Sequence, residues 1–282
     1  MSIANPVQNI AGQPDITAIK AKMKATWMDG DYALFARYME PGALRILEEW
    51  DIAPNVQLLD VGCGAGQIAI PAARAGVKVT GADIADNLIA HARKRAEQEG
   101  LSAHFEIADA EDLPYDEASF DAVTSLIGAM FAPQPLKVAA EFARVCRSGG
   151  RLAMANWTPN GLVGKMFKVI SAHVPPPPGV APAPLWGDED TVTQRLQDGF
   201  TDIQLTRKDY TAWRYPLSVP EVVTFFFHSY GPTKRAFAAL DTAGQMSLRE
   251  GLIEVFAAHN VARDGSTEFH GAEYLDVRAI RR

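Results

Sequence analysis

The stretch 56–66 constrains the fold more than any other part of the chain. It reads Val-Gln-Leu-Leu-Asp-Val-Gly-Cys-Gly-Ala-Gly, an apolar run that ends in alternate glycines, Gly62, Gly64 and Gly66. The run predicts a strand that is buried on both faces. Glycine has no Cβ, so the following turn can adopt positive φ and let a ligand approach the backbone. Residues 67–74 predict a helix after the turn. This order of elements predicts a site for a nucleotide-like ligand.

The spacing of the glycines indicates which kind of ligand to expect. The dinucleotide fingerprint G-x-G-x-x-G would need glycine at position 67, where this chain has Gln67. A second predicted strand, 77–83, ends in Asp83, 21 positions after Gly62. An acid at such a strand end is well placed to accept hydrogen bonds from ribose hydroxyls. The pattern therefore favours a ribose-containing ligand without the usual pyrophosphate turn.

Three further segments continue the alternation of strands and helices. Residues 103–109 predict a strand that ends in Asp109, and residues 120–126 predict the next one. Residues 147–155 predict a glycine turn that leads into a fifth strand. Glu111 and Asp112, after the third strand, are interpreted as solvated charges. Alternating strands and helices predict a mostly parallel α/β sheet.

Taken together, residues 45–157 resemble the core of a class I S-adenosylmethionine (SAM) methyltransferase. The sequence D-x-G-x-G-x-G at 60–66 is similar to motif I of that family, and the nearest type is the ubiquinone/menaquinone-biosynthesis group. The resemblance implies a Rossmann-like, seven-stranded mixed sheet, SAM as cofactor and S-adenosylhomocysteine as product. It implies that Asp109 binds the adenine amino group and that the Ala110 N–H reaches a ring nitrogen. The cofactor residues implied in this core are Asp60, Gly62, Gly64, Gly66, Asp83, Ile84, Asp109, Ala110 and Leu126.

Outside the core, the chain has an N-terminal segment and two insertions. We predict a helical segment over 1–50, which covers the cofactor site, and a methyltransferase domain over 51–282. Gly30-Asp31 predicts a break between two helices in the first segment, and Trp27 and Tyr32 flank it as candidate contacts to the cofactor. The insertions, about 160–187 and 215–265, predict a helical substrate cap. The first contains a proline-rich stretch, 174–184, interpreted as a lid or a stiff surface loop.

The second insertion supplies the candidate catalytic residues. Ser218 and Glu221 spell a capping box that opens a helix. This helix carries three consecutive phenylalanines, 225–227, of which we expect at least one to face a pocket or a neighbouring chain. His228 and Tyr230 are the candidate general bases. A base is needed only if the acceptor must lose a proton.

Composition narrows the class of partner. The net charge of −7 argues against a nucleic-acid substrate, because binding a phosphate backbone needs a basic surface. Cys63 and Cys146 form no C-x-x-C pair, which predicts a reduced, cytoplasmic protein. Residues 1–14 do not resemble a signal peptide, and we expect no membrane span. The six histidines are dispersed, so no metal site is predicted. The oligomeric state is left open between monomer and homodimer.

Three classes of function remain to be compared. The first is in-line SN2 methyl transfer to a small acceptor, apolar and aromatic, with O- and C-methylation equally open. The second is a non-catalytic SAM-binding protein, and the third is an NAD-dependent oxidoreductase. Gln67 and the Asp109-Ala110 pair argue against the third class. The aromatic character of the predicted cap favours the first.

Overall fold

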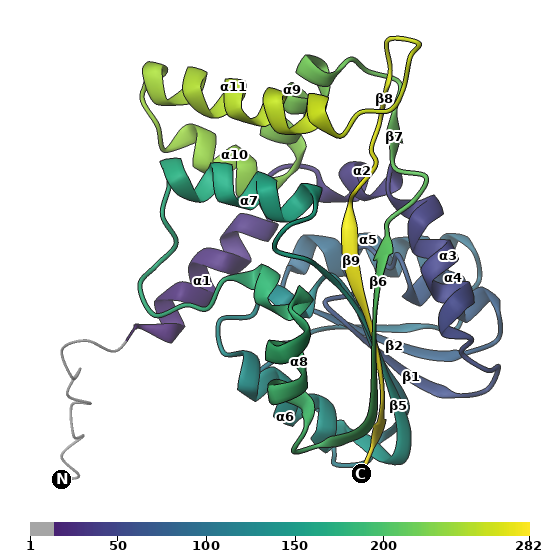
Figure 1. The fold of residues 1–282 in the computed structure, drawn as a ribbon. Helices are drawn as coiled ribbons and strands as arrows, with labels where there is room; N and C mark the ends of the chain where they lie inside the picture. The colour runs from purple at the N-terminus through teal and green to yellow at the C-terminus, as the bar shows by residue number, and fades with distance from the viewer. Residues whose placement is uncertain (1–13) are drawn as a thin grey trace, which may run out of the picture.

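The computed structural model describes residues 14–282 and is built on a mixed sheet of seven strands (Figure 1). The strands lie in the order β3-β2-β1-β4-β5-β9-β6. Their bounds are β1 Gln57–Val61, β2 Lys78–Asp83, β3 His104–Ile107, β4 Phe120–Leu126, β5 Cys146–Trp157, β6 Phe200–Asp209 and β9 Glu273–Arg281. The sheet class expected from the sequence is confirmed.

The direction of the strands positions the candidate site. Strands β1 to β5 run parallel, whereas β9 lies antiparallel to both β5 and β6. The carboxyl ends of the parallel strands therefore meet at one edge of the sheet. The turn after β1 and the acid that ends β2 both lie at this edge, which is where ligands bind in open α/β sheets.

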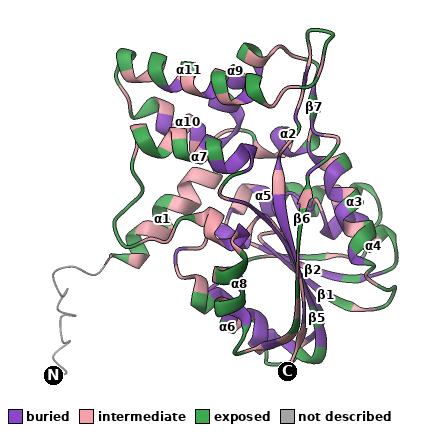
Figure 2. Cartoon of the chain, viewed as in Figure 1, coloured by how far each residue is buried: buried purple, intermediate pink, exposed green. Residues whose placement is uncertain are grey.

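Helices cover both faces of the sheet. Figure 1 shows α6 and α8 side by side on one face and α3, α4 and α5 on the other. Their bounds are α3 Glu40–Trp50, α4 Ala69–Arg74, α5 Asp86–Gln98, α6 Pro135–Val145 and α8 Glu189–Leu196. Each presents an apolar stripe to the sheet, such as Val138, Phe142 and Val145 of α6. The buried residues concentrate between these layers (Figure 2).

The N-terminal segment forms three helices, where the sequence predicted two. The break at Gly30 is confirmed: it separates α1, Ile16–Trp27, from α2, Tyr32–Arg37. A second break before α3 was not predicted. Its physical reason is Pro41, which occupies the first turn of α3. Proline lacks the N–H needed inside a helix but is tolerated in its first turn.

The two insertions come together above the carboxyl edge of the sheet. Figure 1 shows α9 and α11 at the top of the molecule, with α10 and then α7 below α11, and α11 contacts all three of the other helices. Their bounds are α7 Leu162–His173, α9 Val219–Ser229, α10 Gly231–Ala238 and α11 Thr242–Ala258. The predicted capping box of Ser218 and Glu221 is present. Short strands β7, Arg214–Tyr215, and β8, Thr267–Glu268, pair antiparallel at the base of the cap.

The three phenylalanines of α9 were expected to place at least one ring in a pocket or against a neighbouring chain. Phe226 and Phe227 are buried instead, and Phe225 stacks on Phe35 with ring centroids 6.1 Å apart. Phe226 also meets Phe256 of α11 at 4.9 Å. These contacts show that the three rings join α9 to α2 and to the rest of the cap.

The sequence predicted that the chain has no membrane span and no signal peptide, and that its cysteines are reduced. Between residues 14 and 282, no helix combines the length and the apolar character needed to cross a membrane. Cys63 and Cys146 are both buried free thiols. The stretch on which the absence of a signal peptide was expected lies almost wholly outside the described residues.

Candidate functional site

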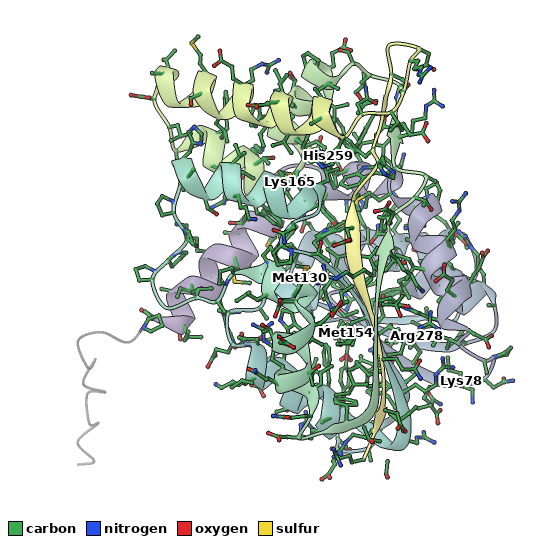
Figure 3. The ribbon with its side chains drawn as sticks, viewed as in Figure 1. Lys78, Met130, Met154, Lys165, His259 and Arg278 are labelled. Carbon is green, nitrogen blue, oxygen red and sulfur yellow. The ribbon has the colours of Figure 1, made fainter. Side chains whose placement is uncertain are left out.

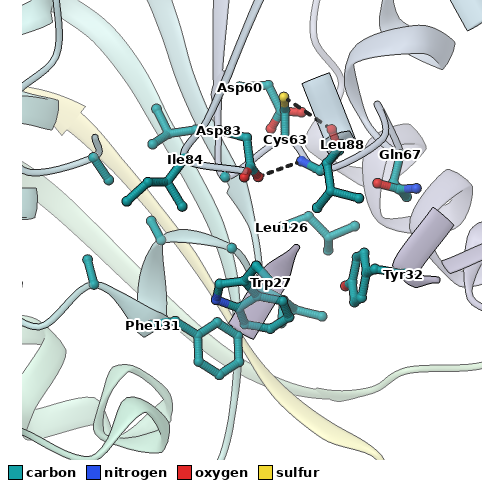
Figure 4. A pocket seen from close by; sticks show the side chains of 18 of the residues that line it. Trp27, Tyr32, Asp60, Cys63, Gln67, Asp83, Ile84, Leu88, Leu126 and Phe131 are labelled. Carbon is teal, nitrogen blue, oxygen red and sulfur yellow. Dashed lines mark hydrogen bonds between the residues drawn. The ribbon is translucent and has the colours of Figure 1, made fainter. Parts of the chain in front are cut away.

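A cleft opens where the glycine turn after β1 meets the ends of β2, β3 and β4. We call it the glycine-turn cleft, and Figure 4 shows it from close by. Helix α1 and the start of α2 cover it, so it lies between the sheet and the N-terminal segment. Of the residues expected to bind a cofactor, those that line it are Trp27, Tyr32, Asp60, Gly62, Gly64, Asp83, Ile84, Asp109, Ala110 and Leu126. Gly66 is outside the lining.

The three glycines of the turn have different surroundings, although all have positive φ. A Cβ on Gly62 would lie 2.6 Å from the Cα of Gly128, so the two backbones touch. A Cβ on Gly66 would meet Ile70 of α4 at 2.7 Å. A Cβ on Gly64 would instead meet side chains that line the cleft, the nearest atom being Oε1 of Gln67 at 2.9 Å. Gly62 and Gly66 therefore serve the turn and its packing, and Gly64 keeps the cleft open.

The carboxylate of Asp83 is held in place by the turn that it faces. Its Oδ2 accepts a hydrogen bond from the Gly64 N–H at 2.8 Å, and its Oδ1 accepts one from the Ala85 N–H at 2.9 Å. Figure 4 shows the first of these bonds at the centre of the cleft. Burial raises the pKa of Asp83 in spite of these bonds. A carboxylate has about four lone-pair positions, so this one can accept further donors from a ligand.

Asp60 is a second buried acid in the cleft. It is 1% exposed and accepts a hydrogen bond from Thr124 Oγ1 at 3.1 Å. Burial is the main cause that raises the pKa of Asp60 to about 7, and the charge of Asp83 adds to it. Burial raises the pKa of the nearby Cys63 thiol well above its usual value. That thiol is therefore protonated near neutral pH and is a poor nucleophile.

Asp109 is linked to the helix that covers the cleft. Lys20 of α1 places its Nζ 2.5 Å from Asp109 Oδ2 and 2.6 Å from Glu111 Oε2. Burial opposes the charge of Lys20, but its hydrogen bonds to these two acids outweigh burial and raise its pKa. The interpretation of Glu111 as a solvated charge was wrong: its side chain is fully buried and also accepts hydrogen bonds from Gln134. The reason is that α1 and the loop before α6 converge on it.

Aromatic rings form the wall of the cleft that faces the cap. Trp27 meets Phe131 with ring centroids 4.8 Å apart and Tyr32 with centroids 5.5 Å apart, both edge to face. Figure 4 shows these three rings on the side opposite Asp60 and Asp83. Burial raises the pKa of Tyr32 above its ordinary range. Its hydroxyl therefore remains neutral at physiological pH.

A second cavity adjoins the first across this wall. We call it the proline chamber, because the proline-rich stretch after α7 forms one side of it, together with α1 and α7. Its volume is about 590 Å³, within the range of ligand pockets. Met23, Trp27 and Phe131 line both cavities. The chamber's other lining residues are Ile19, Lys22, Thr26, Pro159, Gly164, Phe167, Lys168, Ser171, Pro176, Pro177, Val180, Ala181, Pro182, Ala183, Pro184, Leu185 and Pro232.

The two residues predicted as general bases lie in different surroundings. His228 is exposed on α9, with its Nδ1 2.7 Å from the Thr224 carbonyl oxygen, and it lines neither cavity. Tyr230 is buried against Phe35, Trp27 and Tyr32, behind the aromatic wall. Burial raises the pKa of Tyr230 well above its ordinary value, which makes it a poor base. Neither placement supports the base role.

Several residues that line the cavities were missed by the sequence reasoning. Lys20 lies three positions before Met23 and seven before Trp27, a helical spacing that puts the three side chains near one face of α1, so this spacing was a usable signal. Phe131 lies five positions after the end of β4, at the edge where ligands bind. No side-chain group suited to holding a metal ion occurs between residues 14 and 282.

Comparisons with known proteins agree with this geometry. The family described as "Methyltransferase domain" matches residues 59–154, which contain the glycine turn and both strand-end acids. An uncharacterized protein of Mycobacterium tuberculosis is 35% identical over 268 residues, covering 94% of this chain and 96% of its own length. Nocamycin O-methyltransferase of Saccharothrix syringae is 36% identical over 126 residues, covering 43% of this chain and 45% of its own.

Solved structures show the same fold. The phosphoethanolamine N-methyltransferase 2 of Haemonchus contortus, solved with S-adenosyl-L-methionine, is 17% identical, with a TM-score of 0.53 and coverage of 84% of this chain and 51% of that one. The YcgJ protein of Bacillus subtilis is 17% identical, with a TM-score of 0.55 and coverage of 86% and 98%. Of the three classes compared above, these findings favour methyl transfer. Residues 59–154 of the chain form a methyltransferase domain of the class I, SAM-dependent type.

Proposed function

We propose that this enzyme methylates a small, apolar and aromatic acceptor at oxygen or carbon. The observation that carries the proposal is the pair of adjoining cavities, which share Met23, Trp27 and Phe131. One has the polar groups that an adenosine-containing cofactor requires, and the other is a large, mainly apolar chamber. Two reactants that must meet need two such sites in contact.

The groups in the glycine-turn cleft fit SAM. Asp83 would accept hydrogen bonds from the ribose hydroxyls, and Asp109 would accept one from the adenine amino group. Both carboxylates keep free lone pairs beside the bonds that they already accept. Ile84 and Leu126 give the cleft apolar walls, and Gly64 leaves room where a Cβ would project.

SAM supplies a methyl group on a positively charged sulfur, open to in-line displacement. The chain's own contribution is to orient and enclose the reactants. Trp27 is well placed to face that positive charge, because an aromatic face attracts cations. The aromatic wall and α1 exclude water, which strengthens the electrostatic interactions inside. Tyr230 supports Trp27 and Tyr32 from behind and is a positioning residue in this proposal.

Calorimetry with SAM tests the cofactor half of the proposal. We expect Asp83→Asn to weaken SAM binding about 10- to 100-fold, the cost of hydrogen bonds to a charged group. Asp116→Asn, at an exposed position outside both cavities, is the matched control and should bind as the wild type does. Unchanged affinity of Asp83→Asn, with an unchanged melting temperature, would contradict the assignment. A panel of phenols and quinols, scored by release of S-adenosylhomocysteine, tests the acceptor half.

A further inference from the structure

The proline chamber has an unusual charge pattern for this chain. Its only charged lining residues among those described are Lys22 and Lys168, and both are exposed at its mouth. The lining contains no Asp, Glu, His, Cys or Tyr from residues 14–282. The chain as a whole has a net charge of −7. The chamber therefore combines apolar walls with two positive charges at its mouth, although the chain as a whole carries a net negative charge.

The two lysines of α1 that flank Lys22 in the sequence are both paired with acids. On α1, Lys20 binds Asp109 and Glu111, and Lys24 places its Nζ 2.6 Å from Asp86 Oδ1. Lys22, between them, forms no ion pair within residues 14–282. The other lysine of the mouth, on α7, is likewise without a carboxylate partner there, and its Nζ donates to Asn160 Oδ1 at 3.1 Å.

We propose that the chamber selects acceptors that combine an apolar body with an acidic group, such as a carboxylate, an enolate or an acidic phenolate. This inference rests on the proposed function, because it names the class of acceptor for the same site. The apolar walls would take the body of the molecule. Lys22 and Lys168 would attract the anionic acceptor to the chamber, since opposite charges steer ligands toward a site and raise their local concentration.

An ionised acceptor also accounts for the absence of a base in the lining. The acceptor's anionic oxygen supplies the electron pair of the new O–CH3 bond, and the electrons of the broken S–CH3 bond return to sulfur. The negative oxygen and the positive sulfur both become neutral, and no proton has to leave. His228 and Tyr230 are then not required as bases.

A pair of fluorescent probes separates charge from apolar binding. One is 8-anilinonaphthalene-1-sulfonate, whose sulfonate stands for the acidic group, and the other is the neutral N-phenyl-1-naphthylamine. In the double variant Lys22→Gln/Lys168→Gln, we expect the Kd of the sulfonate probe to rise about fivefold or more, as for two exposed ion pairs. The Kd of the neutral probe should stay within about twofold, because the apolar walls are unchanged.

Lys165→Gln is the matched control. Lys165 lies on the same helix as Lys168, but its Nζ contacts Nε2 of His259 at 3.2 Å, and Figure 3 shows the two residues facing each other where α7 meets α11. It should leave both probes unaffected. Ala183→Trp, which adds a large side chain to the lining of the chamber, should weaken binding of both and so locate them.

Two results would overturn the inference. One is a sulfonate probe that binds equally well with and without the two lysines, and the other is probe binding that Ala183→Trp leaves intact. Calorimetry with SAM on the same variants keeps the two proposals apart. Normal SAM affinity, together with a Kd of the sulfonate probe that does not depend on the two lysines, would refute the acidic acceptor. It would leave the proposed SAM site unaffected. Loss of SAM binding in the wild type would remove the proposed function, whatever the probes show.

Discussion

Trp27 and Phe131 meet edge to face, with ring centroids 4.8 Å apart, in the wall shared by the glycine-turn cleft and the proline chamber. One ring comes from the N-terminal helix and the other from the loop after β4, so two distant segments build this wall. The wall is where a methyl group would pass from donor to acceptor. Substitutions in this wall should therefore affect both SAM binding and methyl transfer.

Replacing Trp27 should reveal what its ring contributes. We expect Trp27→Ala to weaken SAM binding about 3- to 30-fold, the range of a cation–π contact. Trp27→Phe should retain most of the affinity, because it keeps an aromatic face. Calorimetry measures both Kd values, and thermal melting checks folding, which should hold because Trp27 is only partly buried. Equal affinities of the wild type and Trp27→Ala would show that the ring does not face the cofactor.

Lys20 should control how firmly α1 closes over the cleft. Helix α1 has no buried residue, so its attachment depends on contacts such as the ion pairs of Lys20. A partly exposed pair contributes up to about 1 kcal/mol, so Lys20→Met should raise hydrogen exchange of the α1 amides about fivefold. It should speed SAM release to a similar degree in stopped-flow fluorescence.

Lys24→Met is the matched control, because it removes a comparable ion pair between Lys24 and Asp86 and leaves Asp109 unchanged. The side chains of that pair are more exposed than those of Lys20 and Glu111. Lys24→Met should loosen α1 less and leave the rate of SAM release nearly unchanged. If Lys20→Met and Lys24→Met gave the same small effect on both measurements, the special role of Lys20 would be excluded.

The sheet and many of the residues that line the glycine-turn cleft could be predicted from the sequence, because both follow from local order. The acids assigned to the cofactor lie at or just after strand ends, Asp83 at the end of β2 and Asp109 two positions after β3, and parallel strands bring their ends to one edge. The three ranges expected for the second, third and fourth strands agree with the observed bounds to within two residues at each end, and 120–126 matches β4 at both ends. Such predictions need no knowledge of distant contacts.

The remaining features depend on segments that lie far apart in the chain. Lys20 and Asp109 are separated by 89 positions, and nothing in either local pattern announces their contact. Glu111 reads as a surface acid until α1 packs over it. The three phenylalanines of α9 carry no signal of which partner each will meet. Tertiary packing decides these features, and a single sequence does not encode it in any short pattern.

Asp60 should make stability depend on pH. Its pKa is raised from 3.8 to about 7 in the folded protein. The folded state therefore holds a proton that the unfolded chain releases, and stability falls as the pH rises through this window. The contribution is fully present below pH 3.8 and lost by about pH 7, and its full size is about 4 kcal/mol, since each pKa unit is worth about 1.4 kcal/mol.

Asp60→Asn should flatten this part of the curve. Urea denaturation between pH 5 and pH 7 measures the free energy of unfolding, which should fall by about 2 kcal/mol less in the variant than in the wild type. Asp83 also has a raised pKa, so its protonation stabilises the folded state in the same direction. Asp83→Asn should therefore also flatten the dependence of the free energy of unfolding on pH. The exposed Asp116→Asn should not change the slope. Parallel curves for the wild type and Asp60→Asn would refute the raised pKa of Asp60.

The glycine turn offers a comparison between stability and binding. Gly62→Ala should destabilise the protein by about 2–5 kcal/mol, since it combines a left-handed backbone with a contact of 2.6 Å to the backbone of Gly128. Gly64→Ala should cost only about 1–2 kcal/mol, because its φ of +54° is accessible to alanine at that cost and its nearest neighbour is a side chain. Gly64→Ala should nevertheless weaken SAM binding more than its stability loss suggests, because its Cβ projects toward the cleft.

Gly100→Ala isolates the backbone term in this comparison. Gly100 has a φ of +64°, and no atom lies within 4 Å of a Cβ built there, so its substitution tests the left-handed conformation alone. Urea denaturation should give Gly100→Ala and Gly64→Ala similar free energies of unfolding, both well above that of Gly62→Ala. Calorimetry should then separate the first two, with normal SAM affinity for Gly100→Ala and weakened affinity for Gly64→Ala. If Gly64→Ala bound SAM normally, the cofactor would not approach the turn at that glycine.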